Sequence, residues 1–236
     1  KKRAGYKLTL QEIFSHGHKR AGHKPAPLKD FSYGHEKEGY IAMVLESFEQ
    51  LAQRARSLPR RTVAVAAAHD AHALEAVRDA AAEGLVDYLL VGDPGEIREL
   101  AEGLGFSPDP ERIIPEGDDA ACAKKAVELC REGRAQLLMK GRLQTSTLLK
   151  EVVNKETGIG MGGLMSHMAL FQIPGFKKLL SVTDGGMVLA PDLAGKKAIL
   201  ENGVRFLRQL GCEEPRVAVL CPVEVVNPKI QATVDA

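Results

Sequence analysis

Residues 62–70 read Thr-Val-Ala-Val-Ala-Ala-Ala-His-Asp, and this stretch decides the fold class. Its first five residues are β-branched or small and apolar, which predicts a buried strand, and Asp70 is placed to cap a helix over 71–83. The same order recurs with strands at 86–91, 112–115 and 136–139 and with helices at 96–104 and 118–131. Four β-α units in a row predict right-handed crossovers, a mainly parallel sheet and a three-layer α/β fold.

The flanking sequence divides the chain further. Apolar residues at helical spacing predict a helix from Met43 to the residue before Pro59. Beyond Gly158 the pattern changes to strands at 168–173 and 178–183, a helix at 192–210 and another buried strand at 216–220. We therefore expect a first α/β lobe over 42–157 and a second lobe over 158–236, built on a different sheet.

Composition excludes several classes of protein. The chain has 236 residues, 44% of them hydrophobic, which is enough for one or two cores. Lys and Arg total 32 against 31 Asp and Glu, so no overall basic charge favours nucleic acid. The longest apolar runs, such as 63–68, are far shorter than the ~20 residues that span a bilayer. We expect a soluble protein that binds neither nucleic acid nor membrane.

Residues 1–41 differ from the rest because they hold nine Lys or Arg and four of the seven histidines. His16, His18 and His23 raise the alternative of a metal site, but Gly17 and Gly22 loosen the backbone that carries them. We expect a flexible, solvated arm and no metal. The four cysteines form no Cys-x-x-Cys pair and no export leader opens the chain, so the expected compartment is the cytoplasm.

The strongest chemical signal follows the fourth predicted strand. Ligands of open parallel sheets bind beyond the carboxyl ends of the strands. Here the sequence is Lys140-Gly-Arg-Leu-Gln-Thr-Ser-Thr147, with two cations, a glycine that would let backbone approach a ligand, and three hydroxyls at a helix start. This pattern is typical of anion binding. It is not a P-loop, because the lysine precedes the glycine. The alternative is that Thr145 or Ser146 merely caps a helix and that Lys140 is a surface residue.

Polar groups in the second lobe allow more than one interpretation. The glycines of 158–163 follow a helix, so they indicate a linker and not a dinucleotide fingerprint. Ser166 and His167 are neighbours on a strand and would point to opposite faces, which argues against a Ser-His hydrolase. Thr183-Asp184-Gly185-Gly186 is either a ligand-binding loop or a turn. Glu224, Asn227 and Lys229 form another polar cluster, beside Cys221, which we interpret as core.

Six of these segments occur together in one family. They are Leu138-Met-Lys-Gly141, Thr145-Ser146, Leu164-Met-Ser-His167, Val182-Thr-Asp-Gly185, Ala190-Pro-Asp-Leu193 and Val223-Glu-Val-Val-Asn-Pro228. In order and spacing the chain resembles the phosphate acetyl/butyryltransferase family from about Phe48 to Ala236, and most closely its phosphate butyryltransferase branch. The resemblance implies two lobes with a cleft between them, and reversible transfer of a butyryl or other short acyl group between CoA and inorganic phosphate.

The resemblance also implies partners and site residues. CoA, acyl phosphate and phosphate are the expected ligands, with no tightly bound cofactor, and a homodimer or larger assembly is expected. By position in the motifs, the substrate-binding residues are Lys140, Thr145, Ser146, Lys150, Ser166, Asp184 and Asn227. The family pattern continues past Ala236 with a Ser-Arg motif and an acid, so we expect the second lobe to be incomplete. Within the chain, the candidates for a catalytic acid or base are Asp184 and Glu224.

The mechanism that the resemblance implies is direct transfer, in which CoA thiolate attacks the carbonyl of an acyl phosphate. Three alternatives stay open at this point. One is a module that binds acyl-CoA or nucleotides without turnover, and another is a phosphate acetyltransferase. The third is a two-function protein with a preceding hydratase domain, for which the 41-residue arm is too short.

Overall fold

A computed structural model describes residues 46–236, which form two compact units. The first comprises Glu49–Gly162. The second comprises Gly163–Ala236 together with the residues just before Glu49. The basic arm, its histidines and Met43 lie outside the described residues. The lobe boundaries expected from the sequence stay predictions.

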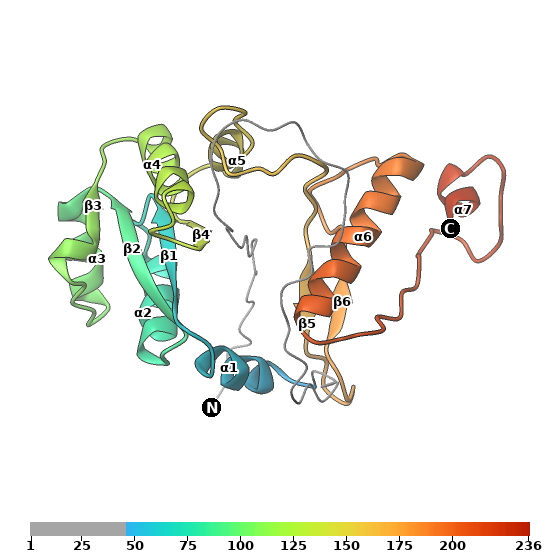
Figure 1. The fold of residues 1–236 in the computed structure, drawn as a ribbon, viewed down its shortest axis with the longest axis horizontal. Coiled ribbons are helices and arrows are strands. Elements are labelled where there is room, and N and C mark those ends of the chain that lie inside the picture. The colour runs from blue at the N-terminus through green and yellow to red at the C-terminus, as the bar shows by residue number, and fades with distance from the viewer. Residues whose placement is uncertain (1–45) are drawn as a thin grey trace. The chain divides into compact units, whose positions relative to one another are not determined.

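The first unit is built on a four-stranded parallel sheet in the order β3-β2-β1-β4 (Figure 1). Its strands are β1 (Arg61–Ala66), β2 (Val86–Gly92), β3 (Ile113–Pro115) and β4 (Leu137–Lys140). Its helices are α1 (Phe48–Arg56), α2 (Ala71–Ala82), α3 (Pro94–Gly103), α4 (Asp119–Arg131) and α5 (Thr145–Val152), with a 3-10 turn, η1 (Pro110–Arg112). The mainly parallel α/β fold expected from the sequence is confirmed.

Helices cover the sheet as right-handed crossovers require. The connections through α2 and α3 step one way along the sheet, and the connection through α4 steps back across it. Right-handed crossovers therefore place α4 on the face opposite α2 and α3. The core between sheet and helices includes Val65, Leu90, Leu74 and Ile97, all fully buried.

The second unit contains a two-stranded antiparallel sheet, β5 (Ala169–Phe171) with β6 (Leu180–Val182). Its helices are α6 (Leu193–Gln209) and α7 (Gln231–Asp235). Both strands are shorter than the sequence predicts, because among residues 46–236 they pair only with each other, through Ala169–Phe171 and Leu180–Val182. The long helix agrees with the prediction to within a residue at each end.

The buried strand predicted at 216–220 is wrong. This segment has no regular secondary structure, and Val219 and Leu220 are 56% and 87% exposed. A strand is stabilised by pairing, and in the described part of the chain no strand lies in hydrogen-bonding register with these residues. The apolar composition alone therefore misled the prediction.

Candidate active site

The carboxyl ends of β1 and β4 form the point where the strand order reverses. The chain steps from β1 to β2 and β3 on one side of the sheet and returns to β4 on the other. In open α/β sheets, ligands bind in the crevice at this kind of switch point. The segment after β4 holds the predicted anion site, so the structure places that segment where the fold favours a ligand.

Helix α5 begins there with an open first turn. Its N-cap, Gln144, makes no side-chain hydrogen bond, and Thr145 and Ser146 are exposed. Among the described residues, none accepts a hydrogen bond from the backbone N–H of Thr145 or Ser146. Free N–H groups at the positive end of a helix bind anions. The alternative that Thr145 or Ser146 caps the helix is wrong, because both lie inside its first turn.

Five other helix starts in the described residues are closed by aspartates, whereas α7 (Gln231–Asp235) begins at Ile230 without a side-chain cap. At the starts of α2, α3, η1, α4 and α6, a backbone N–H donates to the carboxylate of Asp70, Asp93, Asp109, Asp118 and Asp192, respectively. The prediction of Asp70 as a cap is confirmed, with Ala73 donating to it over 2.8 Å. The N-cap position of α5 is Gln144, so an anion bound there would meet no carboxylate at the position that holds an aspartate in the other five elements.

The open cap leads to a stability prediction. Replacing Gln144 by Asp should raise the free energy of unfolding by about 1 kcal/mol, because an Asp side chain accepts N–H bonds that Gln144 leaves unmade. Urea unfolding of the two proteins measures the difference. Gln144→Glu is the matched control, since it adds the same charge without capping geometry. Equal gains from Asp and Glu would mean that the helix dipole and not capping is responsible.

Lys140, the last residue of β4, shapes the loop. Its Nζ donates to the carbonyl oxygens of Gly141 and Leu143, over 2.9 and 3.0 Å. An ammonium has three N–H donors, so one stays for a ligand. Lys140 therefore contributes positive charge at the switch point while it holds the turn between β4 and α5.

Gly141 serves packing. An ideal Cβ at this position would overlap the backbone carbonyl of Ala67, which follows β1. Backbone N–H groups of Gly141 and Arg142 donate to Ala66 and Ala67 over 2.8 and 2.9 Å. From the sequence, Gly141 was expected to let the backbone approach a ligand. In the structure it lets the loop after β4 approach the backbone of Ala67. Gly141 thus ties the loop after β4 to the end of β1.

Lys150 lies in the last turn of α5 and is exposed. It is four residues after Ser146, so both lie on one face of the helix. Side chains lean toward the helix N-terminus, which directs Lys150 back toward Ser146. Thr145 lies about 140° around the helix from Lys150 and is not on this face. Helix geometry therefore groups Lys150 with Ser146 and not with Thr145.

In the second unit, the Asp184 carboxylate is surrounded by backbone donors. Oδ2 accepts from His167 N–H over 3.0 Å, and Oδ1 accepts from Gly186 and Met187 over 2.8 and 2.7 Å. Burial alone would raise the pKa of Asp184, but these bonds and one from Val188 outweigh it and hold the pKa below its ordinary value. A carboxylate so engaged is better suited to positioning His167 than to proton transfer, so its catalytic role stays a prediction.

The lowered pKa gives a pH dependence. Because the folded pKa lies below the unfolded one, Asp184 stabilises the fold fully above the ordinary value of 3.8 and loses this contribution as the pH falls below it. Asp184→Asn should cost about 1–3 kcal/mol at pH 7, and the difference from the parent should shrink toward pH 3. Urea unfolding from pH 7 to 3, with exposed Glu224→Gln as control, measures it. A difference that is constant with pH would contradict the ionised role.

Asn227 and Glu224 differ in how they are held. The Asn227 side chain accepts from Lys229 N–H over 3.0 Å, and its backbone exchanges hydrogen bonds with the buried Thr233 hydroxyl. Glu224 is exposed in a segment without regular secondary structure. The structure therefore gives Asn227 a defined local role and gives Glu224 none. Substrate binding by Asn227 and catalysis by Glu224 stay predictions.

Cysteine chemistry has little support. Burial raises the pKa of Cys130 to about 11, and it also raises the pKa of Cys122. Cys221 is partly exposed, and its thiol donates to the Val223 carbonyl over 3.0 Å. Cys122 and Cys130 are thus poor nucleophiles, and the expectation that Cys221 is core is wrong because its segment lies at the surface.

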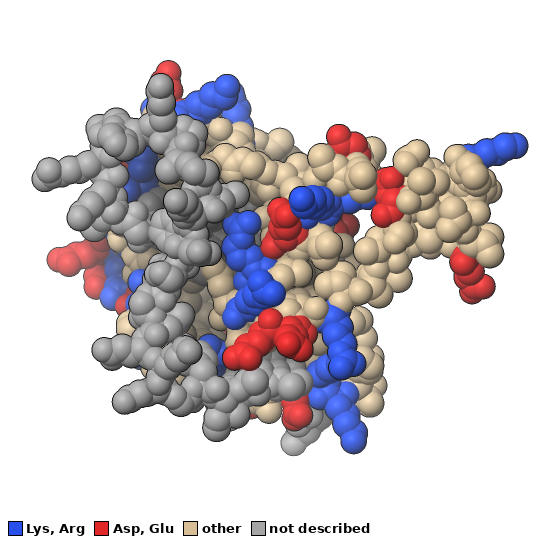
Figure 2. Space-filling view, turned by 45° about the vertical axis from the view of Figure 1, so that its right-hand side comes forward, with Lys and Arg blue, Asp and Glu red and all other residues tan. Residues whose placement is uncertain are grey.

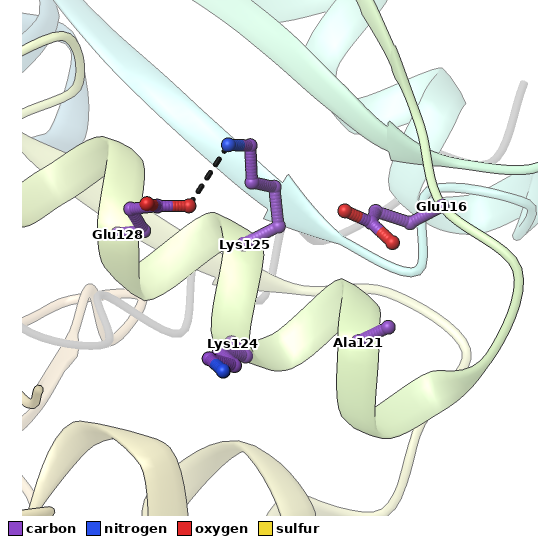
Figure 3. A pocket seen from close by; sticks show the side chains of 5 residues that line it. All are labelled: Glu116, Ala121, Lys124, Lys125 and Glu128. Carbon is purple, nitrogen blue, oxygen red and sulfur yellow. Dashed lines mark hydrogen bonds and ion pairs between the residues drawn. The ribbon is translucent and has the colours of Figure 1, made fainter.

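Two surface pockets are present in the first unit, away from the predicted residues. One, of about 370 Å³, is lined by Glu116, Ala121, Lys124, Lys125 and Glu128 (Figure 3). In it Lys125 pairs with Glu128 over 2.8 Å. The other, of about 410 Å³, includes Thr62 and Asp87 at the opposite, amino-terminal edge of the sheet. Each pocket contains one ion pair, Lys125–Glu128 in the first and Arg112–Asp87 in the second.

One face of the molecule carries mixed charge. On the face drawn in Figure 2, Lys and Arg side chains alternate with Asp and Glu. Within residues 46–236, no group of three or more His, Cys, Asp or Glu side chains is arranged to hold a metal ion. No helix in the same residues is both long and apolar enough to cross a membrane.

Sequence reasoning missed Asn202 and Thr183. Asn202 Nδ2, on α6, donates to Ser166 Oγ over 3.1 Å, and the Thr183 hydroxyl donates to the His167 carbonyl over 2.7 Å. A polar Asn in the middle of an otherwise regular helix was the available signal for the first. Thr183 was noted as part of a turn, but only the fold shows which backbone group it binds.

Comparison with known proteins defines the class. Residues 118–236 match the family model described as "Phosphate acetyl/butaryl transferase". The chain therefore belongs to the phosphate acetyl/butyryltransferase family, as its motifs predicted. The match covers the end of the first unit, including α4, β4 and α5, and the whole of the second from Gly163.

Individual relatives lie in both branches. The chain is 41% identical to the phosphate butyryltransferase of Clostridium acetobutylicum over 193 residues, which are 82% of this chain and 64% of that protein. It is 35% identical to the phosphate acetyltransferase of Rhizobium meliloti, covering 80% and 60%. A branched-chain phosphotransacylase from Enterococcus faecalis has a similar structure, with a TM-score of 0.62, 31% identity and coverage of 75% and 61%. The chain thus spans about three fifths of the length of these relatives.

Proposed function

We propose that the protein transfers a short acyl group between CoA and inorganic phosphate. Membership of the family supports the reaction class, and the open first turn of α5 at the β1/β4 switch point supports a phosphate site. Similarity to a butyryltransferase at 41% identity, against 35% for an acetyltransferase, favours butyryl or a related acyl group. We further propose that it acts in the cytoplasm as a dimer or larger assembly.

The proposed chemistry is direct transfer. The CoA thiolate attacks the carbonyl carbon of an acyl phosphate, so that a C–S bond forms while the C–O bond to phosphate breaks. Phosphate leaves with the electron pair, and the reverse reaction runs through the same tetrahedral species. No protein nucleophile and no tightly bound cofactor are needed, so the protein's contribution is positioning and charge stabilisation.

The residues proposed for the phosphate side are on one loop and helix. The N–H groups of Thr145 and Ser146 donate to phosphate oxygens, and the third N–H of Lys140 and the ammonium of Lys150 add positive charge. Ser166, Asp184 and Asn227 are assigned to substrate binding from the second unit, with Asp184 acting through the backbone of His167.

Titration calorimetry with the two ligands tests the proposal. Inorganic phosphate and CoA should each bind with a stoichiometry of one per chain, and butyryl phosphate should compete with phosphate. Sulfate is the control for simple anion binding and should compete more weakly than butyryl phosphate. Failure of both CoA and phosphate to bind would overturn the proposed function.

A further inference from the structure

The segment from Leu164 to Met168 is fixed mainly by side chains of other elements. Asn202 of α6 donates to the Leu164 carbonyl over 2.9 Å and to Ser166 Oγ over 3.1 Å. On the other side, Thr183 and Asp184 bind the two backbone polar groups of His167. The Ser166 hydroxyl therefore lies between an anchored backbone and a helix side chain.

The Leu164 carbonyl determines which way the Asn202 amide faces. A carbonyl oxygen only accepts hydrogen bonds, so the group that meets it must be the NH₂ of Asn202. The same nitrogen has a second hydrogen, which is directed at Ser166 Oγ. Ser166 therefore accepts from Asn202 and keeps its own O–H proton. In residues 46–236, no group accepts that proton.

Close packing next to Asn202 holds the helix at this distance. Gly203 is buried, and a Cβ there would lie 2.9 Å from the Met168 side chain and 3.4 Å from the Thr183 methyl. The missing side chain thus lets α6 approach the segment that carries Ser166. Asn202, one residue earlier, reaches that segment from a rigid support.

We propose that Asn202 is a positioning residue that presents the Ser166 hydroxyl as a hydrogen-bond donor to an anionic oxygen of the substrate. The inference rests on the proposed function, in which Ser166 binds substrate. Asn202 occupies one of the two acceptor sites of the Ser166 hydroxyl and leaves its single O–H donor to a ligand, and a phosphate oxygen is an acceptor that suits this donor. Asn202 itself acts through Ser166 and touches no substrate.

A double-mutant cycle in phosphate affinity tests this inference. Ser166→Ala and Asn202→Leu should each weaken binding of inorganic phosphate roughly 10-fold, the loss expected for one hydrogen bond to a charged group. The double variant should be no weaker than either single variant, because Asn202 acts only through Ser166. CoA affinity should change less than about twofold. Titration calorimetry of the full chain gives all of these constants.

The inference would be overturned if the loss of phosphate affinity in the double variant equalled the product of the two single losses. It would also be overturned if Asn202→Leu left phosphate affinity unchanged. A wild-type chain that binds neither ligand would refute the proposed function and this inference together, whereas a chain that binds both and shows multiplied losses refutes the inference alone. Glu201→Gln, the exposed neighbour on α6, is the matched control.

A second substitution guards against loss of the fold. Asn202→Asp keeps the shape but offers a carboxylate, which accepts the Ser166 proton and reverses the direction of the hydrogen bond. Asn202→Asp should weaken phosphate binding at least as much as Asn202→Leu does. Its effect should be larger when Ser166 is present than in a protein that already carries Ser166→Ala. Equal losses in the two backgrounds would contradict a role through Ser166. Thermal unfolding of every variant separates loss of affinity from loss of stability.

Discussion

Replacing Lys150 by alanine is expected to weaken phosphate binding by roughly 10- to 150-fold, the range for one charge-assisted contact of about 1.5–3 kcal/mol. Lys150 shares a helix face with Ser146, and side chains on a helix lean toward its N-terminus, which here is the open first turn of α5. CoA binding measured alone should change much less. Titration of each ligand separately into the parent and the variant gives both numbers.

Lys155→Ala is the matched control, because Lys155 is exposed just beyond the same helix. It should leave the affinity for phosphate within about twofold. Equal losses for phosphate and CoA in Lys150→Ala would show that Lys150 supports the fold or binds the phosphates of CoA. A similar loss in Lys155→Ala would show that only the general surface charge matters.

Replacing Gly141 by alanine is expected to lower the free energy of unfolding by about 3 kcal/mol or more. The added methyl group would overlap the Ala67 carbonyl, which is backbone and cannot move without shifting the end of β1. Overpacking costs about 1–3 kcal/mol where side chains can adjust, and more where they cannot. Urea unfolding measures the loss, and phosphate affinity should fall with it, because the same junction positions α5.

Gly103→Ala is the control for this substitution. Gly103 is the last residue of α3 and has open space around its Cα, so alanine there should stabilise the protein by about 0.5–1 kcal/mol. A Gly141→Ala protein as stable as the parent would mean that the loop after β4 can move away from β1. The anion site would then not be fixed by this junction.

The first unit was predictable because its strands are buried runs bounded by clear signals. Val63 and Val65 are nearly or fully buried in β1, and Asp70 and Asp118 cap the helices that they precede. Such patterns are local, so the sequence alone reveals them. The sequence predicted a parallel sheet with right-handed crossovers but no strand order, and the pairing of β4 with β1 comes from the structure.

The second unit was less predictable because its strands depend on partners. Apolar residues at 216–220 have the composition of a strand, yet Val219 and Leu220 are exposed and unpaired in the described chain. Similarly, the link from Asn202 to Ser166 joins residues 36 positions apart. No local pattern encodes a contact of this kind, since it depends on how α6 packs at Gly203.

In the candidate site, residue types were predictable and their partners were not. The sequence indicated an anion site after β4, and the uncapped start of α5 supports it. It did not indicate that Lys140 binds two carbonyls of its own loop, or that Gly141 packs against Ala67. Those contacts come from the junction of two strands that are distant in sequence.

Release of free thiol from butyryl-CoA, followed with and without inorganic phosphate, tests the proposed acyl transfer most directly. We predict thiol release that depends on phosphate, with one butyryl phosphate formed for each thiol and a reduced rate at subsaturating phosphate in Lys150→Ala. Thiol release that proceeds at the same rate without phosphate, or without formation of butyryl phosphate, would contradict acyl transfer to phosphate.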